Sequence, residues 1–495
     1  MRCSWTRLFF VSLLTALVAC GGGDSSEQGD GERAERRADN APRPHVILIS
    51  LDTTRPDHLG AYGNPDARTP TLDALARESA VFVDMTTAAP TTLASHMSIF
   101  TGTHPHTHGT ARNGFVVNPK NLTLAEVLSD AGYRTAGFVA SFALDRRFGC
   151  DQGFEHWDQD FDRRDGDGDY DQDQRTAGAV TDSVLRYLDG GDVDRATDPR
   201  PMFLFVHYFD PHLPYEPPWP DRELCGDPSP GEPIDVAAVR NQSTLQPGIS
   251  FPEAERLAAR YAGEIRYMDR ELGRLIDGLR ERSILDDAIV VVVSDHGENH
   301  HEHHDTFDHG HTLYQTAVRV VGMIRKGEGF RNADASTVDW YPTILKLAGV
   351  PAPHGSRPIE GLAYNSVMEG LVELGYYPGR ARSEATKPWQ DYEVEGKWTN
   401  AYKSRMIRGF AYKYIFTPYR RTEELYALDS DPGETRNLLA GERSAEIEKV
   451  RKELREALDS WAGSADPFES RFDDSQQRET IERLKRLGYL ERREE

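Results

Sequence analysis

The stretch AIVVVVS, at residues 288–294, is an unbroken apolar run that ends directly before Asp295 and His296. Three further runs have the same character, at residues 45–51, 134–140 and 202–209. Unbroken rather than alternating apolar runs are typical of parallel strands that are covered on both faces. Amphipathic stretches lie between the runs, the clearest at residues 257–279, where apolar side chains recur at spacings of three and four. The sequence therefore predicts an α/β sheet protein.

The C-terminal part of the sequence has a different character. Short β-like pieces occur after about residue 381, at residues 406–418 and 424–428, and charged helical patterns such as residues 444–461 follow them. We therefore expect three parts in the folded chain: a large α/β domain at residues 45–380, a smaller antiparallel subdomain at 381–440 and a helical tail at 441–495.

The N-terminus has the pattern of a secretory signal. Arg2 and Arg7 precede a short apolar run at residues 8–18. The sequence LVAC at residues 17–20 then resembles a bacterial lipobox. We expect a lipoprotein signal peptide at residues 1–19; the alternative is an ordinary signal peptide whose cysteine is accidental.

Cleavage at that point would leave lipid on the sulfur of Cys20. Residues 20–44 are polar, with almost nothing to bury, and predict a flexible tether. We therefore expect the protein in the bacterial cell envelope, lipid-anchored and either periplasmic or surface-exposed. Gly21 after the cysteine, in place of an aspartate, favours the outer membrane.

The charge balance argues against one class of partner. The chain carries 58 basic and 81 acidic side chains, which gives a formal net charge of −23. Phosphate backbones are bound by clustered Lys and Arg. We therefore expect no nucleic acid among the partners of this protein.

Two cysteines, Cys150 and Cys225, remain in the part of the chain expected to fold. A disulfide between them is permitted in an oxidising compartment. Two buried thiols are equally compatible with the sequence, so both alternatives stay open.

Three of the apolar runs are followed by an acidic residue: Asp52, Asp210 and Asp295. In an open α/β sheet the carboxyl ends of the strands border the ligand crevice, so three carboxylates are expected to meet there. His296 adds a nitrogen ligand, and residues 299–311 are rich in His, Glu and Asp. Such a cluster suits a divalent cation.

A candidate nucleophile lies in the segment that follows Pro90. Residues 93–100 predict the opening of a helix, with Thr92 in the N-cap zone. A hydroxyl there lies beside unbonded backbone N–H groups and the positive end of the helix dipole, which favours a bound anion. Thr92 is either a plain helix cap or, if a metal ion lowers the pKa of its hydroxyl, a nucleophile.

Seven motifs, in order, resemble the sulfatase family of the alkaline phosphatase superfamily over residues 45 to about 439. They are LISLDTTRPDHLGAYG (48–63), TLASHMSIFTGTHPHTHG (92–109), HYFDPHLPYEPP (207–218), SDHGE (294–298), HGHTLY (309–314), WYPTILKLAGVPAP (340–353) and ELYALDSDPGETRNL (424–438). The resemblance implies an α/β fold with a large mixed central sheet flanked by helices, and a small C-terminal four-stranded antiparallel sheet. It also implies hydrolysis of a sulfate or phosphate ester by a metal-bound nucleophile, through a covalent intermediate.

The resemblance carries over to particular residues. It implies that Asp52, Thr92, Asp295 and His296 hold the metal, with Thr92 as the nucleophile. It also implies that three histidines contact the anionic ester substrate and that two of them, His212 and His309, are catalytic. The third, His96, stands where the family motif has arginine. A second metal at Asp210, His212 and His309 is a further possibility that the two-zinc members of the superfamily suggest.

The sequence departs from the sulfatase pattern at its centre. Sulfatases oxidise a Cys or Ser to formylglycine, and Thr92 at that position cannot become the aldehyde, so we expect no formylglycine. Thr53 stands in place of the second aspartate of the family's DD pair. A threonine nucleophile instead resembles the phosphoryl-transfer members of the superfamily, such as nucleotide pyrophosphatases.

One imidazole, two carboxylates and an alkoxide form a mixed N/O set that fits Zn²⁺ best, with Mn²⁺, Ca²⁺ or Mg²⁺ as alternatives. We therefore expect a metal-dependent ester hydrolase on a lipoprotein. A phosphoethanolamine-type transferase is one alternative, although such proteins usually carry several N-terminal membrane helices. A non-catalytic glycan-binding surface lipoprotein is the other.

Overall fold

The structure is a computed structural model. It separates the chain into two units, whose boundary lies between Arg43 and Pro44. The predicted signal peptide and Cys20, and the tether as far as residue 42, lie outside the described residues. Within the described part, no helix combines the length and the apolar character that a membrane span requires. The residues that the structure describes are 43–161, 173–190, 198–227, 251–300, 302–304, 308–325, 330–331, 335–353, 358–363, 381–385, 393–394, 397–398, 402–409, 411–464, 466, 468–469, 471–472, 480 and 483–484.

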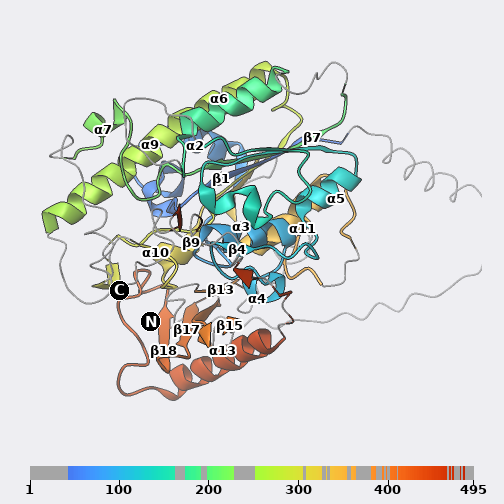
Figure 1. The fold of residues 1–495 in the computed structure, drawn as a ribbon. Helices are drawn as coiled ribbons and strands as arrows, with labels where there is room; N and C mark the ends of the chain where they lie inside the picture. The colour runs from blue at the N-terminus through green and yellow to red at the C-terminus, as the bar shows by residue number, and fades with distance from the viewer. Residues whose placement is uncertain are drawn as a thin grey trace, which may run out of the picture. The chain divides into compact units, whose positions relative to one another are not determined.

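An eight-stranded mixed sheet lies at the centre, in the order β11-β2-β10-β8-β1-β7-β5-β6 (Figure 1). The four predicted strands take adjacent places in it, β8-β1-β7-β5, and all pair in parallel, which confirms the prediction. Strand β10 runs antiparallel to β8 and β2, so the sheet is mixed, as the family resemblance implied. The strands are β1 Val46–Leu51, β2 Ser79–Phe82, β5 Arg134–Phe138, β6 His156–Asp158, β7 Met202–Tyr208, β8 Ile289–Val293, β10 Gly322–Arg325 and β11 Phe330–Arg331.

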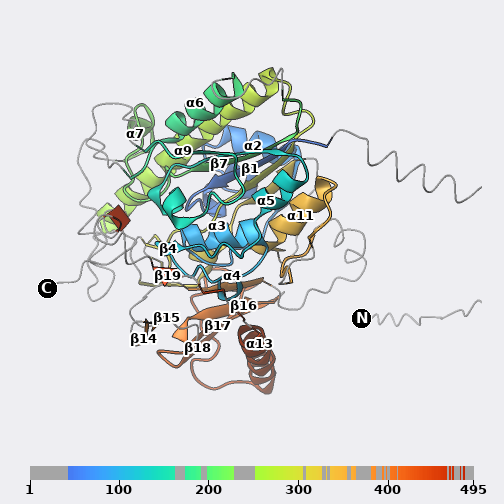
Figure 2. The same cartoon turned by 45° about the vertical axis from the view of Figure 1, so that its right-hand side comes forward.

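Helices cover both faces of this sheet, which explains why its strands are apolar on both sides. One face carries α2 (Pro70–Arg77), α6 (Ala177–Leu188) and α9 (Phe251–Glu281), as Figure 2 shows. The other carries α3 (Thr92–Thr101), α5 (Leu124–Asp130) and α11 (Trp340–Leu347). Helix α9 contains the predicted amphipathic stretch, and its apolar stripe, from Leu257 to Leu279, is buried.

The C-terminal part forms a four-stranded antiparallel sheet in the order β13-β16-β17-β18, as expected. Its strands are β13 Ala381–Glu384, β16 Arg405–Arg408, β17 Tyr412–Thr417 and β18 Thr422–Ala427. Helix α13 (Ala445–Gly463), within the predicted tail, packs on this sheet through Leu458 against Ile407, Tyr414 and Leu425. The chain then returns to the large domain, where β19 (Arg471–Phe472) pairs with β4 (Phe115–Val116). The tail is therefore packed on both parts.

The small elements complete the fold. Helices of a single turn are α4 (Pro105–His108), α7 (Asp221–Leu224) and α10 (Gln315–Val318). A three-stranded sheet joins β12 (Ala335–Ser336), β3 (Met85–Thr86) and β9 (Arg319–Val320), and a two-stranded one joins β14 (Glu393–Val394) to β15 (Lys397–Trp398). Cys150 and Cys225 are two thiols in this structure and form no disulfide.

A buried ionic cluster and a backbone hydrogen bond, both at Glu384, join the C-terminal sheet to the chain on either side of α3. The Glu384 carboxylate accepts from Lys403 at 3.0 Å and from Arg405 at 2.9 Å, and His106 Nδ1 lies 3.1 Å from it. Although burial alone would raise it, Lys403 and His106 hold the pKa of Glu384 well below its usual value. The Glu384 N–H donates to the carbonyl of Ala88 at 3.0 Å. The C-terminal sheet thus holds the chain four residues before Thr92.

The pairing of β5 with β6 depends on a residue without a side chain. A Cβ on Gly137 would lie 2.3 Å from the ring of Trp157, its partner across the two strands. We expect Gly137→Ala to lower the free energy of unfolding by about 1–3 kcal/mol, the usual cost of overpacking a core. Chemical denaturation measures this. Gly463→Ala, at the end of α13 with no atom within 4 Å of the added Cβ, should be neutral or slightly stabilising.

Candidate active site

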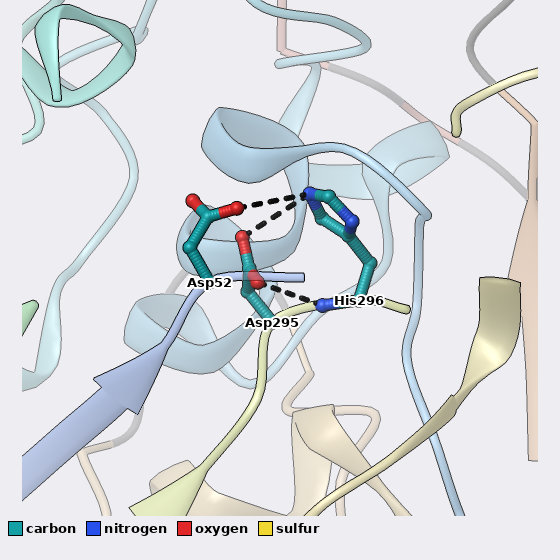
Figure 3. A group of neighbouring side chains, drawn as sticks. All are labelled: Asp52, Asp295 and His296. Carbon is teal, nitrogen blue, oxygen red and sulfur yellow. Dashed lines mark hydrogen bonds and ion pairs between the residues drawn. The ribbon is translucent and has the colours of Figure 1, made fainter. Parts of the chain in front are cut away.

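Three predicted metal ligands meet at the carboxyl edge of the sheet (Figure 3). Asp52 follows β1, while Asp295 and His296 follow the neighbouring parallel strand β8. One ligand atom from each lies within 4.8 Å of the others, and all three residues are fully buried. His296 Nε2 is 3.9 Å from Asp52 Oδ1 and 3.4 Å from Asp295 Oδ2. Adjacent strands therefore bring together residues that are more than 240 positions apart.

Hydrogen bonds to the backbone set the orientation of these ligands. The Nδ1–H of His296 donates to the carbonyl of Gly297 at 2.9 Å, so the Nε2 atom carries the lone pair that faces the carboxylates. Asp295 Oδ1 accepts from the N–H groups of His296 at 2.8 Å and Thr53 at 3.2 Å. The other oxygen of Asp295 is thereby left toward His296.

The donor set fits a divalent cation. Asp52 Oδ1 and Asp295 Oδ2 have no hydrogen-bond partner within the described part of the chain. Burial raises the pKa of both carboxyl groups well above the usual value, and the charge of Glu298 adds to this for Asp52, as that of Asp52 does for Asp295. Buried carboxylates need a counter-charge, which a metal ion supplies. Asp52, Asp295 and His296 could hold it.

Thr92 lies at the edge of this group. It is the first residue of α3, and Thr91 rather than Thr92 is the N-cap residue, with extended backbone angles (φ −150°, ψ 146°). Thr92 Oγ1 is 3.5 Å from His296 Nε2. The Thr92 side chain also partly offsets the rise that burial causes in the pKa of Asp52. The N-terminus of a ten-residue helix thus places a hydroxyl against the candidate metal ligands.

Asn113, which no pattern in the sequence singles out, contacts the first turn of α3 beside Thr92. Its Oδ1 accepts from the N–H of Leu93, next to Thr92, at 2.7 Å. The residue is 3 % exposed, and its Nδ2 has no partner among the described residues. Nothing in the sequence distinguishes Asn113 from a turn residue, because its contact with α3 arises only in the folded chain.

Two predicted histidines, His212 and His309, lie beside the metal ligands. Their ring centroids are 5.0 Å apart, and the His309 ring is 4.3 Å from the ring of His296. The Nδ1–H of His212 donates to the carbonyl of Leu213 at 2.7 Å, and that of His309 to Glu298 at 3.2 Å. Both rings therefore have a set orientation in which Nε2 is the nitrogen for proton exchange. Glu298 was missed, although it lies within the SDHGE motif.

Asp210 does not join the other carboxylates. Both of its side-chain oxygens lie 3.0 Å from the N–H of Ala177, the first residue of α6. Burial raises the pKa of Asp210 to about 7. Among the described residues, Asp210, His212 and His309 do not form a group that could hold a metal. The expected meeting of three carboxylates is therefore wrong, because Asp210 lies two residues beyond β7 and bonds the start of a helix.

The geometry does not support the predicted substrate contact of His96. The ring is fully buried, its Nδ1–H donates to the carbonyl of Thr92 at 2.7 Å, and Ser50 Oγ lies 2.8 Å from Nε2. Burial also lowers the pKa of His96 well below its usual value. With both nitrogens bonded to protein atoms, His96 instead anchors the first turn of α3 to the sheet.

A second buried histidine, His207, was missed. It lies in β7, and its Nε2 is 3.0 Å from Asp52 Oδ2. Burial, followed by the charge of Arg175, lowers the pKa of His207 to about 3, so the imidazole is neutral. A signal was present: His207 and Ser50 are polar residues inside apolar strands, and they occupy paired positions of β7 and β1.

Comparison with known proteins finds matches in both sequence and fold. The family model described as Sulfatase matches residues 44–350, more than half of the chain. An arylsulfatase of Clostridium perfringens is 26 % identical over 482 residues, covering 84 % of this chain and 95 % of that protein. The phosphonate monoester hydrolase of Agrobacterium radiobacter superposes with a TM-score of 0.68 at 20 % identity, covering 86 % of this chain and 96 % of that one. A protein solved with its substrate D-glucosamine-2-N,6-O-disulfate gives a TM-score of 0.66 at 21 % identity, covering 86 % and 99 %.

Metal binding should stabilise the folded protein, because the ion would supply the counter-charge that two buried carboxylates need. At a metal concentration about 100 times Kd, we expect a gain of about 2–3 kcal/mol. Thermal unfolding of the chelator-treated protein with and without Zn²⁺ or Mn²⁺ measures it. Asp295→Asn should lose most of this gain, whereas Asp66→Asn, at an exposed turn, should keep it. An equal response in all three proteins would contradict the assignment.

Proposed function

The chain belongs to the sulfatase family, and from that premise we propose that it hydrolyses a sulfate or phosphate ester with Thr92 as the nucleophile. The observation that carries the proposal is the position of Thr92 Oγ1, 3.5 Å from His296 Nε2 at the start of α3. The hydroxyl thus lies beside a helix end that favours a bound anion, which is where a nucleophile would need to be. A bound divalent cation, with Zn²⁺ favoured by the N/O donor set, would supply Lewis acidity and lower the pKa of that hydroxyl.

Donors around Thr92 suit the charge that develops on the ester. The positive end of the dipole of α3 favours an anion there. The Nδ2 of Asn113 adds a buried donor, held one residue from Thr92 by the bond from Leu93 N–H to Oδ1. These donors would bind the non-bridging oxygens of the ester and stabilise the charge of the transition state.

The proton balance assigns work to His212 and His309. Thr92 Oγ attacks the sulfur or phosphorus atom while its proton passes to an imidazole, the ester bond to the leaving oxygen breaks, and the imidazolium so formed gives that proton to the leaving oxygen. Water then attacks the Thr92 ester and gives one proton to the imidazole. The bond from Thr92 Oγ to the sulfur or phosphorus atom breaks, and the imidazolium returns that proton to Oγ, so that inorganic sulfate or phosphate is released and the hydroxyl is restored. Imidazole suits both steps because its ordinary pKa lies near neutrality.

A phosphate ester is the favoured substrate of the two. The formylglycine of sulfatases comes from Cys or Ser, and Thr92 stands at that position. The similar proteins include an arylsulfatase and a phosphonate monoester hydrolase, so the fold accommodates both kinds of anion. The proposed location is the bacterial cell envelope with lipid on Cys20, which the basic start, the short apolar run and the LVAC sequence support.

Substitution of the nucleophile tests this proposal. We expect Thr92→Ala to lose at least about 10³-fold in kcat, since mutation of a catalytic nucleophile removes most of the rate enhancement. Thr92→Ser should keep measurable activity because it retains the hydroxyl. The measurement uses the purified protein with Zn²⁺ or Mn²⁺ on an aryl sulfate, an aryl phosphate monoester, a phosphonate monoester and a phosphodiester.

The substrate panel also separates the alternatives. Cleavage of aryl sulfate alone would overturn the preference for phosphate esters. Transfer of the group to an added alcohol in place of water would favour the phosphoethanolamine-type transferase. No turnover of any ester, with glycan binding retained, would favour the non-catalytic surface protein.

Asn113 gives a second, independent prediction. We expect Asn113→Ala to lower kcat by about 10²-fold, the usual cost of removing one donor to a transition-state oxyanion. Asn121→Ala is the matched control, because Asn121 is also buried and its Nδ2 donates to the carbonyls of His108 and Asn118, away from Thr92. Steady-state kinetics at saturating substrate compares them; equal losses in the two variants would show that Asn113 acts only on folding.

A further inference from the structure

We propose that His207 is a positioning residue that sets the carboxylate of Asp52 for metal binding. The inference rests on the proposed metal site. His207 would contact neither the substrate nor the metal ion, and would act only through its hydrogen bond to Asp52. Its basis is a line of hydrogen bonds that runs across three neighbouring strands of the sheet, from the end of β5 through β7 to the end of β1.

The protonation of the His207 ring follows from its two neighbours. The N–H of Ala140, just beyond β5, donates to Nδ1 at 3.3 Å. Because a backbone N–H can only donate, Nδ1 must accept, and the single proton of the neutral ring lies on Nε2. That Nε2–H donates to Asp52 Oδ2 at 3.0 Å. The backbone of one strand therefore decides which way the imidazole donates.

This hydrogen bond gives the two carboxylate oxygens of Asp52 different surroundings. Oδ2 is held by His207, whereas Oδ1 lies 3.9 Å from His296 Nε2 and has no hydrogen-bond partner within the described part of the chain. A carboxylate pinned at one oxygen cannot rotate about its last bond without losing that donor. The other oxygen is thus kept toward the centre of the candidate metal group before any ion arrives.

The surroundings of His207 prevent the ring from turning. The residue is fully buried, and its ring packs edge-on against His96, with centroids 5.1 Å apart and planes at 89°. Phe205, two residues earlier on the same face of β7, stacks at 6.5 Å. Strand β7 is also bonded to the backbone of Asp52, since the Asp52 N–H donates to the carbonyl of Tyr208 at 2.9 Å. His207 is therefore a pre-set donor, as outer groups of metal sites commonly are.

His108 offers a matched control elsewhere in the core. It is also fully buried, and both ring nitrogens are bonded, Nε2 with Ser98 Oγ at 3.0 Å and Nδ1 with the N–H of Thr110 at 3.1 Å. Its partners do not include any of the candidate metal ligands. Replacing either histidine removes two buried hydrogen bonds, so the loss of stability should be similar. Only His207 should change metal affinity.

The test measures metal affinity directly, with the full chain. Wild type, His207→Phe, His207→Gln and His108→Phe are stripped with a chelator, and Zn²⁺ and Mn²⁺ are titrated by calorimetry or against a competing dye. We expect His207→Phe to weaken binding about 10–100-fold, the usual effect of losing an outer partner. His207→Gln should recover much of the affinity, because its amide can accept from Ala140 and donate to Asp52. His108→Phe should bind as the wild type does.

Activity gives a second readout that a purely structural role would not move. Added metal should restore kcat in His207→Phe toward the wild-type value, because the defect lies in occupancy of the site. If His207→Phe does not fold, His207→Asn replaces it, since the shorter amide cannot reach both partners, and Gln should then bind metal more tightly than Asn.

Two results would overturn the inference: wild-type affinity in folded His207→Phe, or an equal loss of affinity in His108→Phe. The proposed function fails separately. If the wild type hydrolyses no ester but the affinities differ as expected, His207 positions a metal in a non-hydrolytic site; if the wild type binds no metal, the metal site itself is wrong.

Discussion

The burial of two neighbouring carboxyl groups is the constraint on which the rest of the site depends. Asp52 and Asp295 end adjacent parallel strands, so the topology of the sheet forces them together in a place from which water is excluded. Such an arrangement is costly unless a cation joins it. Backbone N–H groups hold one oxygen of Asp295, and His207 holds one of Asp52. These hydrogen bonds thus offset part of the electrostatic cost before any ion binds.

The nucleophile reaches these carboxylates through a different part of the fold. Helix α3 begins at Thr92, and His96 ties its first turn to the sheet. The C-terminal sheet bonds the segment before it through Glu384 and Ala88, beside a cluster of buried charges. A subdomain that contributes none of the proposed catalytic residues therefore helps to place the hydroxyl. The position of Thr92 thus depends on the packing of the C-terminal sheet against the large domain.

The sequence predicts the structure correctly where one local pattern decides it. The unbroken apolar runs gave four parallel strands, and the spacing of Leu257 to Leu279 gave helix α9. It also grouped Asp52, Asp295 and His296, because strand order places their run ends at one edge. Asp210 shows the limit: it also follows an apolar run, yet the start of α6 takes both of its oxygens.

The sequence by itself determined three features of this protein. These are the residue types at the strand ends, the threonine in place of a formylglycine precursor, and the motifs of the sulfatase family. They determine the fold class and the kind of chemistry, because apolar periodicity and donor type act locally. Only the tertiary structure decided the roles of Asn113, His207 and His96. Each depends on a hydrogen bond between segments that are 20 to 155 positions apart, in a direction that only the packing of the chain creates. A hydrogen bond is directional and short, so composition and spacing cannot specify it.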